Sequence, residues 1–335
     1  MKLATLRSQE ADGRLLVVSR DLSCAVLATS IVATLQQALE NWHAVEPPLR
    51  QLYQQLNDGV CADAIAFAPQ DCAAPLPRAY QWLDASSFTH HGELMQQAFH
   101  LPPLEGAETT PLMYQGASDD FIGGREPIRL PSEAHGIDFE GEFFVLSDAV
   151  PMGCSALQAR QHIKLIGLLN DVSLRALAPR EMRNGFGFVQ AKPTTSFAAV
   201  VVTPDELGES WRDERVHLDL QVYWNGELFG HPNGAEMNFS FARLIEHAAL
   251  TRRLCAGTVL GSGTVSNRDR AAGSACISER RALEMIESGA AHTPFMAFGD
   301  HILMQVLGTD GQSLFASIDQ TVVQFAAVAS RSNQQ

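Results

Sequence analysis

The sequence predicts an α+β fold with more strand than helix. Short runs rich in Val, Ile, Leu and Phe recur along the chain, at 143–146, 198–203, 218–224 and 302–307, and such runs are typical of strands. Apolar residues at helical spacing are confined to a few short segments. Because strands and helices do not alternate regularly, a doubly wound parallel sheet is disfavoured. A length of 335 residues allows a large buried core and more than one domain.

Residues 1–78 are expected to form a small N-terminal α+β domain. Strand-like runs flank a turn at Asp12–Gly13, and residues 31–42 carry apolar side chains at helical spacing. Pro47–Pro48 is expected to end that helix, and a second short helix is expected over 49–56.

A proline-containing linker over 73–77 leads into the second domain, residues 79–330. Within it, Asn225–Gly226 follows a strand-like run and predicts a hairpin turn. The helices of this domain are expected over 93–99, 156–169, 241–253 and 280–288. The second domain is therefore expected to be mostly β.

Composition excludes several classes of protein. A formal net charge of −14 argues against a nucleic-acid partner, because phosphate binding needs clustered Lys and Arg. No run of about 18 apolar residues exists to form a membrane-spanning helix. The six cysteines form no Cys-x-x-Cys motif, so reduced thiols are expected. A cytoplasmic enzyme without a membrane partner is the expectation.

The segment 136–145 carries Glu140 and Glu142 in a run that otherwise predicts a strand. Side chains two residues apart on a strand point to the same face, so the two carboxylates would stand side by side. A solvated outer face would explain this spacing. Asp171, inside a mostly apolar run, favours burial of all three acids around a cation. Oxygen donors without clustered His or Cys indicate Mg²⁺, Mn²⁺ or Ca²⁺.

With these motifs the chain resembles the fumarylacetoacetate hydrolase (fumarylacetoacetase) family. The segments that carry the resemblance are 114–121, 136–142, 170–175, 190–192, 261–265 and 273–279. The resemblance implies a β-roll-like catalytic core behind the small N-terminal domain, and a homodimer. It also implies a metal site formed by Asp120, Glu140, Glu142 and Asp171. For Asp120, a polar turn ahead of Gly123–Gly124 is the alternative.

Further site residues are implied by the resemblance. Lys192 matches a lysine that faces the metal, where an ammonium would stabilise an enolate. Arg175 matches a substrate-contacting arginine, although a salt bridge to Asp171 or Glu142 would explain it equally well. Gly263 and Thr264 match a segment beside the substrate, where backbone N–H groups and a hydroxyl can hold a carboxylate.

The remaining implied residues activate water. Glu279 matches the family's water-activating glutamate, or is a first-turn acid of the helix that follows. The family pairs that glutamate with a histidine between the first aspartate and the Glu-x-Glu. Seven residues past Asp120 stands Pro127, Arg125 stands where a histidine is expected, and His135 is the histidine available nearby. His135 is therefore the candidate catalytic histidine, with an ordinary loop histidine as the alternative.

Three functions follow from these residues. The first, implied by the resemblance, is metal-dependent hydrolysis of a C–C bond in a 1,3-diketo acid, such as an acylpyruvate or fumarylacetoacetate. Such a reaction belongs to aromatic-compound catabolism, including tyrosine degradation. The second is decarboxylation or isomerisation of a keto acid, which needs the metal but no activated water. The third is a non-catalytic, metal-stabilised β protein.

Overall fold

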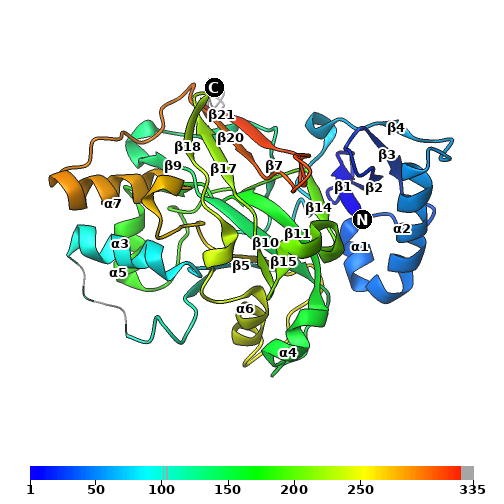
Figure 1. Cartoon of the computed structure of the whole chain (residues 1–335), viewed down its shortest axis with the longest axis horizontal. Helices are drawn as coiled ribbons and strands as arrows, with labels where there is room; N and C mark the ends of the chain where they lie inside the picture. Colours follow the sequence, from blue (N-terminus) through cyan, green and yellow to red (C-terminus); the bar gives the residue numbers. More distant parts are fainter. Residues whose placement is uncertain (101, 103–104, 326–335) are drawn as a thin grey trace, which may run out of the picture.

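The computed structural model describes residues 1–100, 102 and 105–325. It confirms an α+β fold with more strand than helix, built on a 12-stranded and a five-stranded sheet. The N-terminal segment, drawn in blue, lies at one side of the molecule, and the remainder of the chain surrounds the central strands (Figure 1). None of the helices among these residues is long and apolar enough to cross a membrane.

The N-terminal segment is a small sheet covered by two helices. Its elements are β1 (Lys2–Leu6), β2 (Arg14–Val18), β3 (Cys24–Leu27), α1 (Leu35–Glu40), α2 (Trp42–Asn57), β4 (Ile65–Ala66) and the 3₁₀ turn η1 (Pro69–Asp71). Alternate residues of β2 point to opposite faces: Leu15 and Val17 join the core cluster that contains Leu35 and Leu49, while Leu16 joins the other cluster. The two helices therefore cover one face of these strands.

The strands of the N-terminal segment continue into the main sheet. β1 pairs antiparallel with β14, with Leu3 opposite Val201. The strand order is β4-β3-β2-β1-β14-β11-β10-β19-β5-β6, with β13 and β7 off this path. The main-sheet strands beyond β4 are β5 (Trp82–Ala85), β6 (Met113–Gly116), β7 (Ile122–Gly123), β10 (Gly141–Ser147), β11 (Ile163–Asn170), β13 (Ser196–Phe197), β14 (Val200–Val202) and β19 (Val259–Gly261). The two expected domains thus share one sheet.

A second sheet has the order β18-β17-β20-β21-β8. Its strands are β8 (Ile128–Leu130), β17 (Gln221–Trp224), β18 (Glu227–Gly230), β20 (His301–Gln305) and β21 (Ile318–Gln324); two short pairs are β9 (Ile137–Asp138) with β12 (Ser173–Leu174), and β15 (Trp211–Arg212) with β16 (Arg215–Val216). Asn225 and Gly226 connect β17 to β18 with positive φ of 52° and 84°. The predicted hairpin turn is confirmed.

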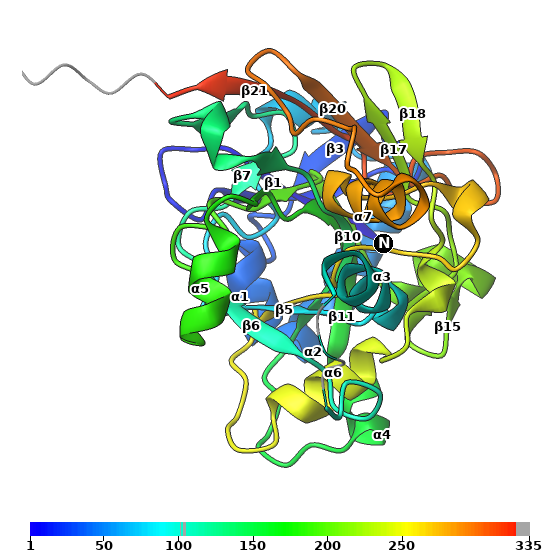
Figure 2. The same ribbon diagram turned by 90° about the vertical axis from the view of Figure 1, so that its left-hand side faces the viewer.

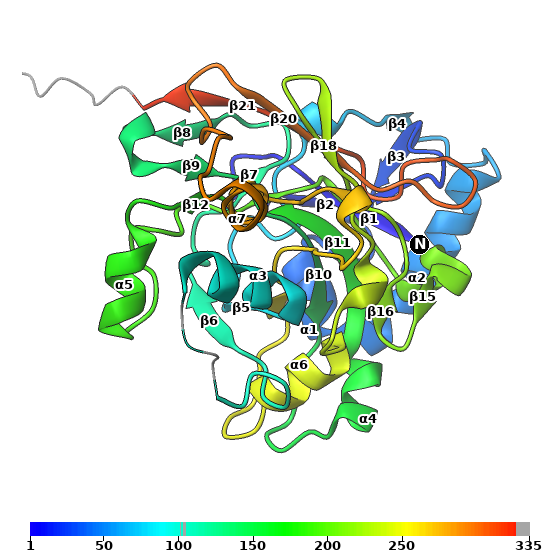
Figure 3. The same cartoon turned by 60° about the vertical axis from the view of Figure 1, so that its left-hand side comes forward.

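The helices beyond the N-terminal segment are few. They are α3 (Thr89–Phe99), α4 (Ala156–Ala159), α5 (Ala178–Asn184), α6 (Phe241–Ala248) and α7 (Ile277–Ser288), with 3₁₀ turns η2 (Glu133–His135), η3 (Arg160–His162), η4 (Pro204–Ser210), η5 (Gly234–Glu236) and η6 (Arg270–Ala272). α3 and α7 pack against each other, and the turned views show them one above the other in front of the strands β10 and β11 (Figures 2 and 3).

Besides the helix expected over 241–253, which ends at Ala248, two predicted element boundaries are wrong, and the first concerns the prolines. Pro47 and Pro48 lie inside α2 and do not end a helix. A helical proline leaves the carbonyl four residues earlier without its usual donor. Here those carbonyls belong to the exposed residues His43 and Ala44, so water can solvate them. Burial of the apolar face that includes Leu49 outweighs the loss of two hydrogen bonds.

The second wrong boundary is the helix expected over 156–169. Only Ala156–Ala159 is α-helical, and Ile163–Asn170 forms β11 at the centre of the main sheet. A strand buried on both faces is apolar throughout, so it lacks the alternation that identifies a half-buried strand. Seven of its eight residues are buried, as a central strand requires.

We expect Gly167→Ala to destabilise the protein by about 1–3 kcal/mol. Gly167 lies opposite Phe144, and an added Cβ would come within 2.4 Å of that ring. Urea unfolding measures the loss. Gly92→Ala in α3 is the control, because nothing lies within 4 Å of its Cβ position and alanine favours a helix. Equal stability of Gly167→Ala and the wild type would contradict this packing.

Candidate metal centre and acid–base pair

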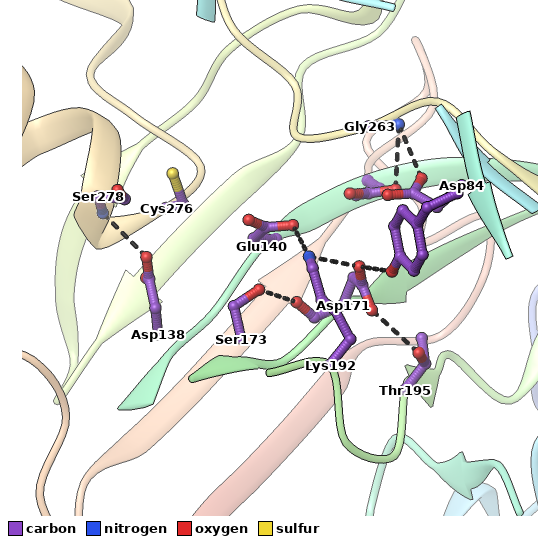
Figure 4. Close-up of polar contacts among 12 residues, drawn as sticks. Asp84, Asp138, Glu140, Asp171, Ser173, Lys192, Thr195, Gly263, Cys276 and Ser278 are labelled. Atoms are coloured by element: carbon purple, nitrogen blue, oxygen red, sulfur yellow. Dashed lines mark hydrogen bonds and ion pairs between the residues drawn. The ribbon is translucent and has the colours of Figure 1, made fainter. Parts of the chain in front are cut away.

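Four buried carboxylates meet at the centre of the main sheet. They belong to Asp84 on β5, Glu140 and Glu142 at the start of β10, and Asp171 after β11. One oxygen from each lies within 4.8 Å of the other three. Figure 4 shows Asp84, Glu140 and Asp171 around Lys192.

Strand pairing explains how the three acids expected from the sequence meet. Gly141 lies opposite Asn170, so Glu140 and Glu142 flank the end of β11. The backbone N–H of Asp171 donates to the carbonyl of Glu140 at 2.9 Å, and the Asn170 side chain accepts from the N–H of Glu140 at 3.0 Å. Glu140, Glu142 and Asp171 are thereby fixed on one side of the sheet.

The fourth acid is Asp84, and the prediction of Asp120 is wrong. Asp120 is exposed and lies outside the carboxylate cluster. Asp84 reaches the cluster because β5 runs parallel to β19, with Asp84 beside Gly261. This pairing joins residues far apart in the sequence, so local spacing could not reveal it.

Two glycines make room for these acids. A Cβ on Gly261 would lie 2.5 Å from Asp84 Oδ1 and 2.9 Å from Glu142 Oε2. The backbone N–H of Gly263 donates to both carboxylates, at 3.2 Å to Asp84 and 3.1 Å to Glu142 (Figure 4). The glycine-rich segment therefore contacts two acids of the four-carboxylate cluster directly. Thr264 follows it and is buried, with 6 % exposure.

Lys192 neutralises part of the negative charge. Its Nζ donates to Glu140 Oε2 and to Asp171 Oδ2, both at 2.6 Å. Tyr114 donates its hydroxyl to the same Asp171 oxygen at 2.6 Å, and Thr195 donates to Asp171 Oδ1 at 3.0 Å. Burial alone would lower the pKa of Lys192, but the charges of Asp171 and Glu140 outweigh burial and raise it.

Arg175 binds two acids, and neither is Asp171 or Glu142, the two salt-bridge partners expected as alternatives. Its Nε donates to Asp138 Oδ2 at 2.8 Å, and its Nη2 donates to Glu140. Asp138 is fully buried and lies outside the four-carboxylate cluster. The guanidinium therefore joins a metal-ligand candidate to a buried acid behind it.

The four acids differ in their affinity for protons. Burial would raise the pKa of Glu140, yet the charges of Lys192, Arg175 and, less strongly, His91 lower it to about 2. Burial and the charge of Asp171 raise the pKa of Asp84 to about 8. Burial and the charge of Asp84 raise the pKa of Glu142 well above its ordinary value. Asp84 and Glu142 therefore favour the protonated form more than exposed acids do, and a bound cation would favour their charged forms instead.

The donor set fits a hard divalent cation. Glu142 Oε1 is buried and has no hydrogen-bond partner among the described residues. The cluster offers oxygen donors alone, which suits Mg²⁺, Mn²⁺ or Ca²⁺ better than zinc. Asp84, Glu140, Glu142 and Asp171 would hold the ion, and Gly261 leaves the space in which Asp84 and Glu142 approach each other.

An acid–base pair lies beside this cluster. Glu279, the third residue of α7, has a carboxylate 2.7 Å from Nδ1 of His91 on α3. Glu279 is buried, with 1 % exposure. The packing of α3 against α7 brings the two residues together (Figure 2). His91 is also close enough to Glu140 to affect the pKa of that acid.

His135 is not the partner of Glu279. No hydrogen bond or ion pair joins the two among the residues that the structure describes; His135 ends η2, where its backbone carbonyl accepts from Ala176. The sequence did contain the signal for His91. The seven-residue interval that leads from Asp120 to Pro127 leads from Asp84 to His91. The wrong choice of aspartate therefore caused the wrong choice of histidine.

We expect a divalent cation to stabilise the protein more as the pH rises from about 6 to about 8. The folded-state pKa of Asp84 is raised to about 8, so its favourable contribution is complete below the unfolded pKa and is lost as the pH rises toward 8. A bound cation replaces the proton and removes that loss. Thermal unfolding with and without MnCl₂ measures the difference, and an equal metal-induced shift at both pH values would contradict it.

Comparison with known proteins agrees with the fold. Residues 81–323 match the fumarylacetoacetate (FAA) hydrolase C-terminal family, and residues 1–78 match the fumarylacetoacetase N-terminal domain 2 family. An oxaloacetate tautomerase of Xenopus laevis is 24 % identical over 157 residues, which is 46 % of this chain and 47 % of that protein. A 2,4-didehydro-3-deoxy-L-rhamnonate hydrolase of Sphingomonas sp. is 28 % identical over 159 residues, 47 % of this chain and 53 % of that protein. The matches thus span about half the length of these curated relatives.

Solved structures share the fold at low identity. A putative HpcE protein from Mycobacterium smegmatis superposes with a TM-score of 0.68 at 19 % identity, covering 97 % of this chain and 100 % of the other. Maleylpyruvate hydrolase from Sphingobium sp. SYK-6, solved with manganese(II) and pyruvate, gives 0.64 at 15 % identity, with the same coverage. The family match extends over most of the chain. This protein therefore belongs to the fumarylacetoacetate hydrolase family of enzymes.

Proposed function

We propose that this protein is a divalent-metal-dependent hydrolase that cleaves a C–C bond in a 1,3-diketo acid. The contact of 2.7 Å between Glu279 and His91, beside the four buried carboxylates, is the observation that carries the proposal. A metal-supported enolate alone would not require a carboxylate–histidine pair. Hydrolysis gives such a pair a role, because a water molecule must lose a proton as it attacks a carbonyl carbon.

The pair is arranged to accept that proton. Glu279 accepts from Nδ1 of His91, so the tautomer that it favours leaves Nε2 free as a base. His91 Nε2 would take one proton from water while the water oxygen forms a bond to the distal keto carbon. The low exposure of Glu279 keeps its carboxylate from being solvated, which strengthens the orienting hydrogen bond.

Bond cleavage follows from collapse of the tetrahedral adduct. The C–C bond to the central carbon breaks, and its electron pair stays on that carbon as an enolate, which then accepts a proton from protonated His91. The products are a carboxylic acid and a 2-keto acid. A bound divalent cation would polarise the keto oxygens of the substrate. Lys192, between Glu140 and Asp171, would stabilise the enolate charge.

Arg175 and Thr264 are proposed to contact the substrate carboxylate. Two nitrogens of Arg175 already bind Asp138 and Glu140, which leaves Nη1 for a ligand. The backbone N–H of Gly263 already donates to Asp84 and Glu142, so in this segment the buried Thr264 would supply the donor through its hydroxyl. These groups are hydrogen-bond donors, and a carboxylate next to the keto group of the substrate would accept hydrogen bonds from them.

Isomerisation, tautomerisation or decarboxylation of a keto acid is the second candidate. The relative from Xenopus laevis is an oxaloacetate tautomerase, and a similar fold is described as a probable isomerase from Mycobacterium abscessus. These reactions need the metal ligands and Lys192 but no activated water. The importance of the His91–Glu279 pair therefore distinguishes the two functions.

The expected homodimer stays a prediction. Exposed apolar side chains gather on α5 and the segment that follows it, where Met182, Phe186 and Val189 are 65 %, 99 % and 87 % exposed. Solvent-exposed apolar groups of this kind are typical of contact surfaces. Light scattering after gel filtration would give the mass of the particle.

The substrate class is tested by a screen of 1,3-diketo acids and oxaloacetate with Mg²⁺ or Mn²⁺. We expect loss of the enol absorbance of an acylpyruvate together with release of a carboxylic acid. The EDTA-treated protein is the control. Turnover of oxaloacetate with CO₂ release, or interconversion of its tautomers, without hydrolysis of any diketo acid would favour the second function.

We expect His91→Ala and Glu279→Gln each to lower kcat for hydrolysis on the order of 10²–10⁴-fold. The double variant should be little worse than either single one, because groups that act as a unit are not additive. His135→Ala is the matched control, since His135 makes no contact with Glu279 in the described part of the chain. Multiplicative losses in the double variant would show that the two residues act separately.

A further inference from the structure

Asp138 is a fully buried acid that the proposed reaction does not use. It stands two residues before Glu140, on β9, and it is outside the metal-binding cluster. β9 pairs with β12, which places Asp138 opposite Ser173 and close to Arg175. Figure 4 shows Asp138 between the carboxylate cluster and the first turn of α7.

The carboxylate of Asp138 binds the beginning of α7. Oδ1 accepts from the N–H of Ile277 at 2.7 Å, and Oδ2 accepts from the N–H of Ser278 at 2.9 Å. These are the first two backbone donors of the helix, which lack partners inside the helix. The third donor, the N–H of Glu279, is bound by Sγ of Cys276 at 3.3 Å. The first three backbone N–H groups of α7, including that of Glu279, are thus bound by acceptors outside the helix.

The same carboxylate binds the metal side of the site. Asp138 Oδ2 accepts from Arg175 Nε at 2.8 Å, and Arg175 Nη2 donates to Glu140. One continuous set of polar contacts therefore runs from Glu140 through Arg175 and Asp138 to α7, and from Glu279 to His91. It joins a candidate metal ligand to the candidate water-activating pair.

The chemistry of the contacts requires an anion at position 138. Two backbone N–H groups at a helix N-terminus and one guanidinium are all donors, and the helix dipole adds positive potential there. A carboxylate accepts from all three with two oxygens. An asparagine has nearly the same volume, but its amide nitrogen would face donors. The Asp138→Asn variant therefore removes the charge while nearly preserving the side-chain volume.

We propose that Asp138 is a positioning residue that couples the metal centre to α7 and thereby sets the orientation of Glu279. A cation bound to Glu140 fixes the carboxylate that holds Arg175, and Arg175 holds Asp138. The inference rests on the proposed function only in its last step, where Glu279 acts on water. The coupling between the metal centre and α7 does not depend on any substrate.

The coupling is measured without a substrate. Hydrogen–deuterium exchange of the first turn of α7 is compared with and without Mn²⁺, and calorimetry gives the Mn²⁺ affinity of each variant. In the wild type we expect Mn²⁺ to slow exchange at the amides of Ile277 and Ser278. In Asp138→Asn we expect Mn²⁺ binding to be retained and that slowing to be lost. Arg175→Gln breaks the same connection from the other side and should give the same result.

The matched control is Glu284→Gln on the same helix. Glu284 accepts from the N–H groups of His292 at 2.6 Å and Thr293 at 2.9 Å, so it holds the segment after α7 and not its beginning. The control should lose stability and keep the Mn²⁺ response in the first turn. A wild type without a response in α7, or an Asp138→Asn variant that keeps it, would overturn the coupling.

Kinetic measurements test the last step of the proposal, in which Asp138 acts on catalysis through Glu279. If Asp138 acts through Glu279, Asp138→Asn should lower kcat on the order of 10-fold or more with little change in KM, and should add almost nothing in a Glu279→Gln background. Full additivity would show a separate, structural role. If no diketo acid is hydrolysed by the wild type, the proposed function fails, while the exchange experiment still decides whether Asp138 couples the metal centre to α7.

Discussion

The structure depends on one electrostatic constraint, namely that four carboxylates are buried together in the middle of a sheet. Such a group is costly unless cations or protons neutralise it. Lys192 and Arg175 provide two positive charges for the four carboxylates, and Arg175 also pairs with Asp138. Burial and the neighbouring acids raise the pKa of Asp84 and of Glu142, so these two acids favour the protonated form more than exposed acids do. The remaining negative charge fits a divalent cation as a further neutralising group.

The sheet satisfies this constraint through strands that are adjacent in space and distant in sequence. β10 is paired on one side with β11 and on the other with β19, which is followed by β5. Each of these strands, or the residue after it, contributes a ligand or the glycine that makes room for one. The N-terminal strands enter the same sheet through β1 and β14, so the small domain extends the framework that holds the metal site.

The sequence was sufficient to predict those site residues that local spacing along a strand, or an acid within an apolar run, identifies. The two-residue period of Glu140 and Glu142 and the acid at 171 predicted three of the four clustered acids. Asp84 was missed because its position depends on a parallel pairing of β5 with β19, and His91 was then missed with it. The helix expected over 156–169 failed for a related reason, because a run of apolar residues in a central strand has no distinguishing period. The positions of these elements depend on pairing between strands that are distant in sequence, which composition and local spacing do not reveal.

Different parts of the fold supply the carboxylate cluster and the acid–base pair, so one metal centre could serve different reactions. The main sheet positions the carboxylates, and Lys192, in the segment before β13, donates to two of them. His91 and Glu279 come from α3 and α7, which pack on each other outside the sheet. A change in these helices could remove the activated water without altering the metal ligands. Hydrolysis and isomerisation would then differ by the position of two helices, and Asp138 is the residue that connects one of them to the strands.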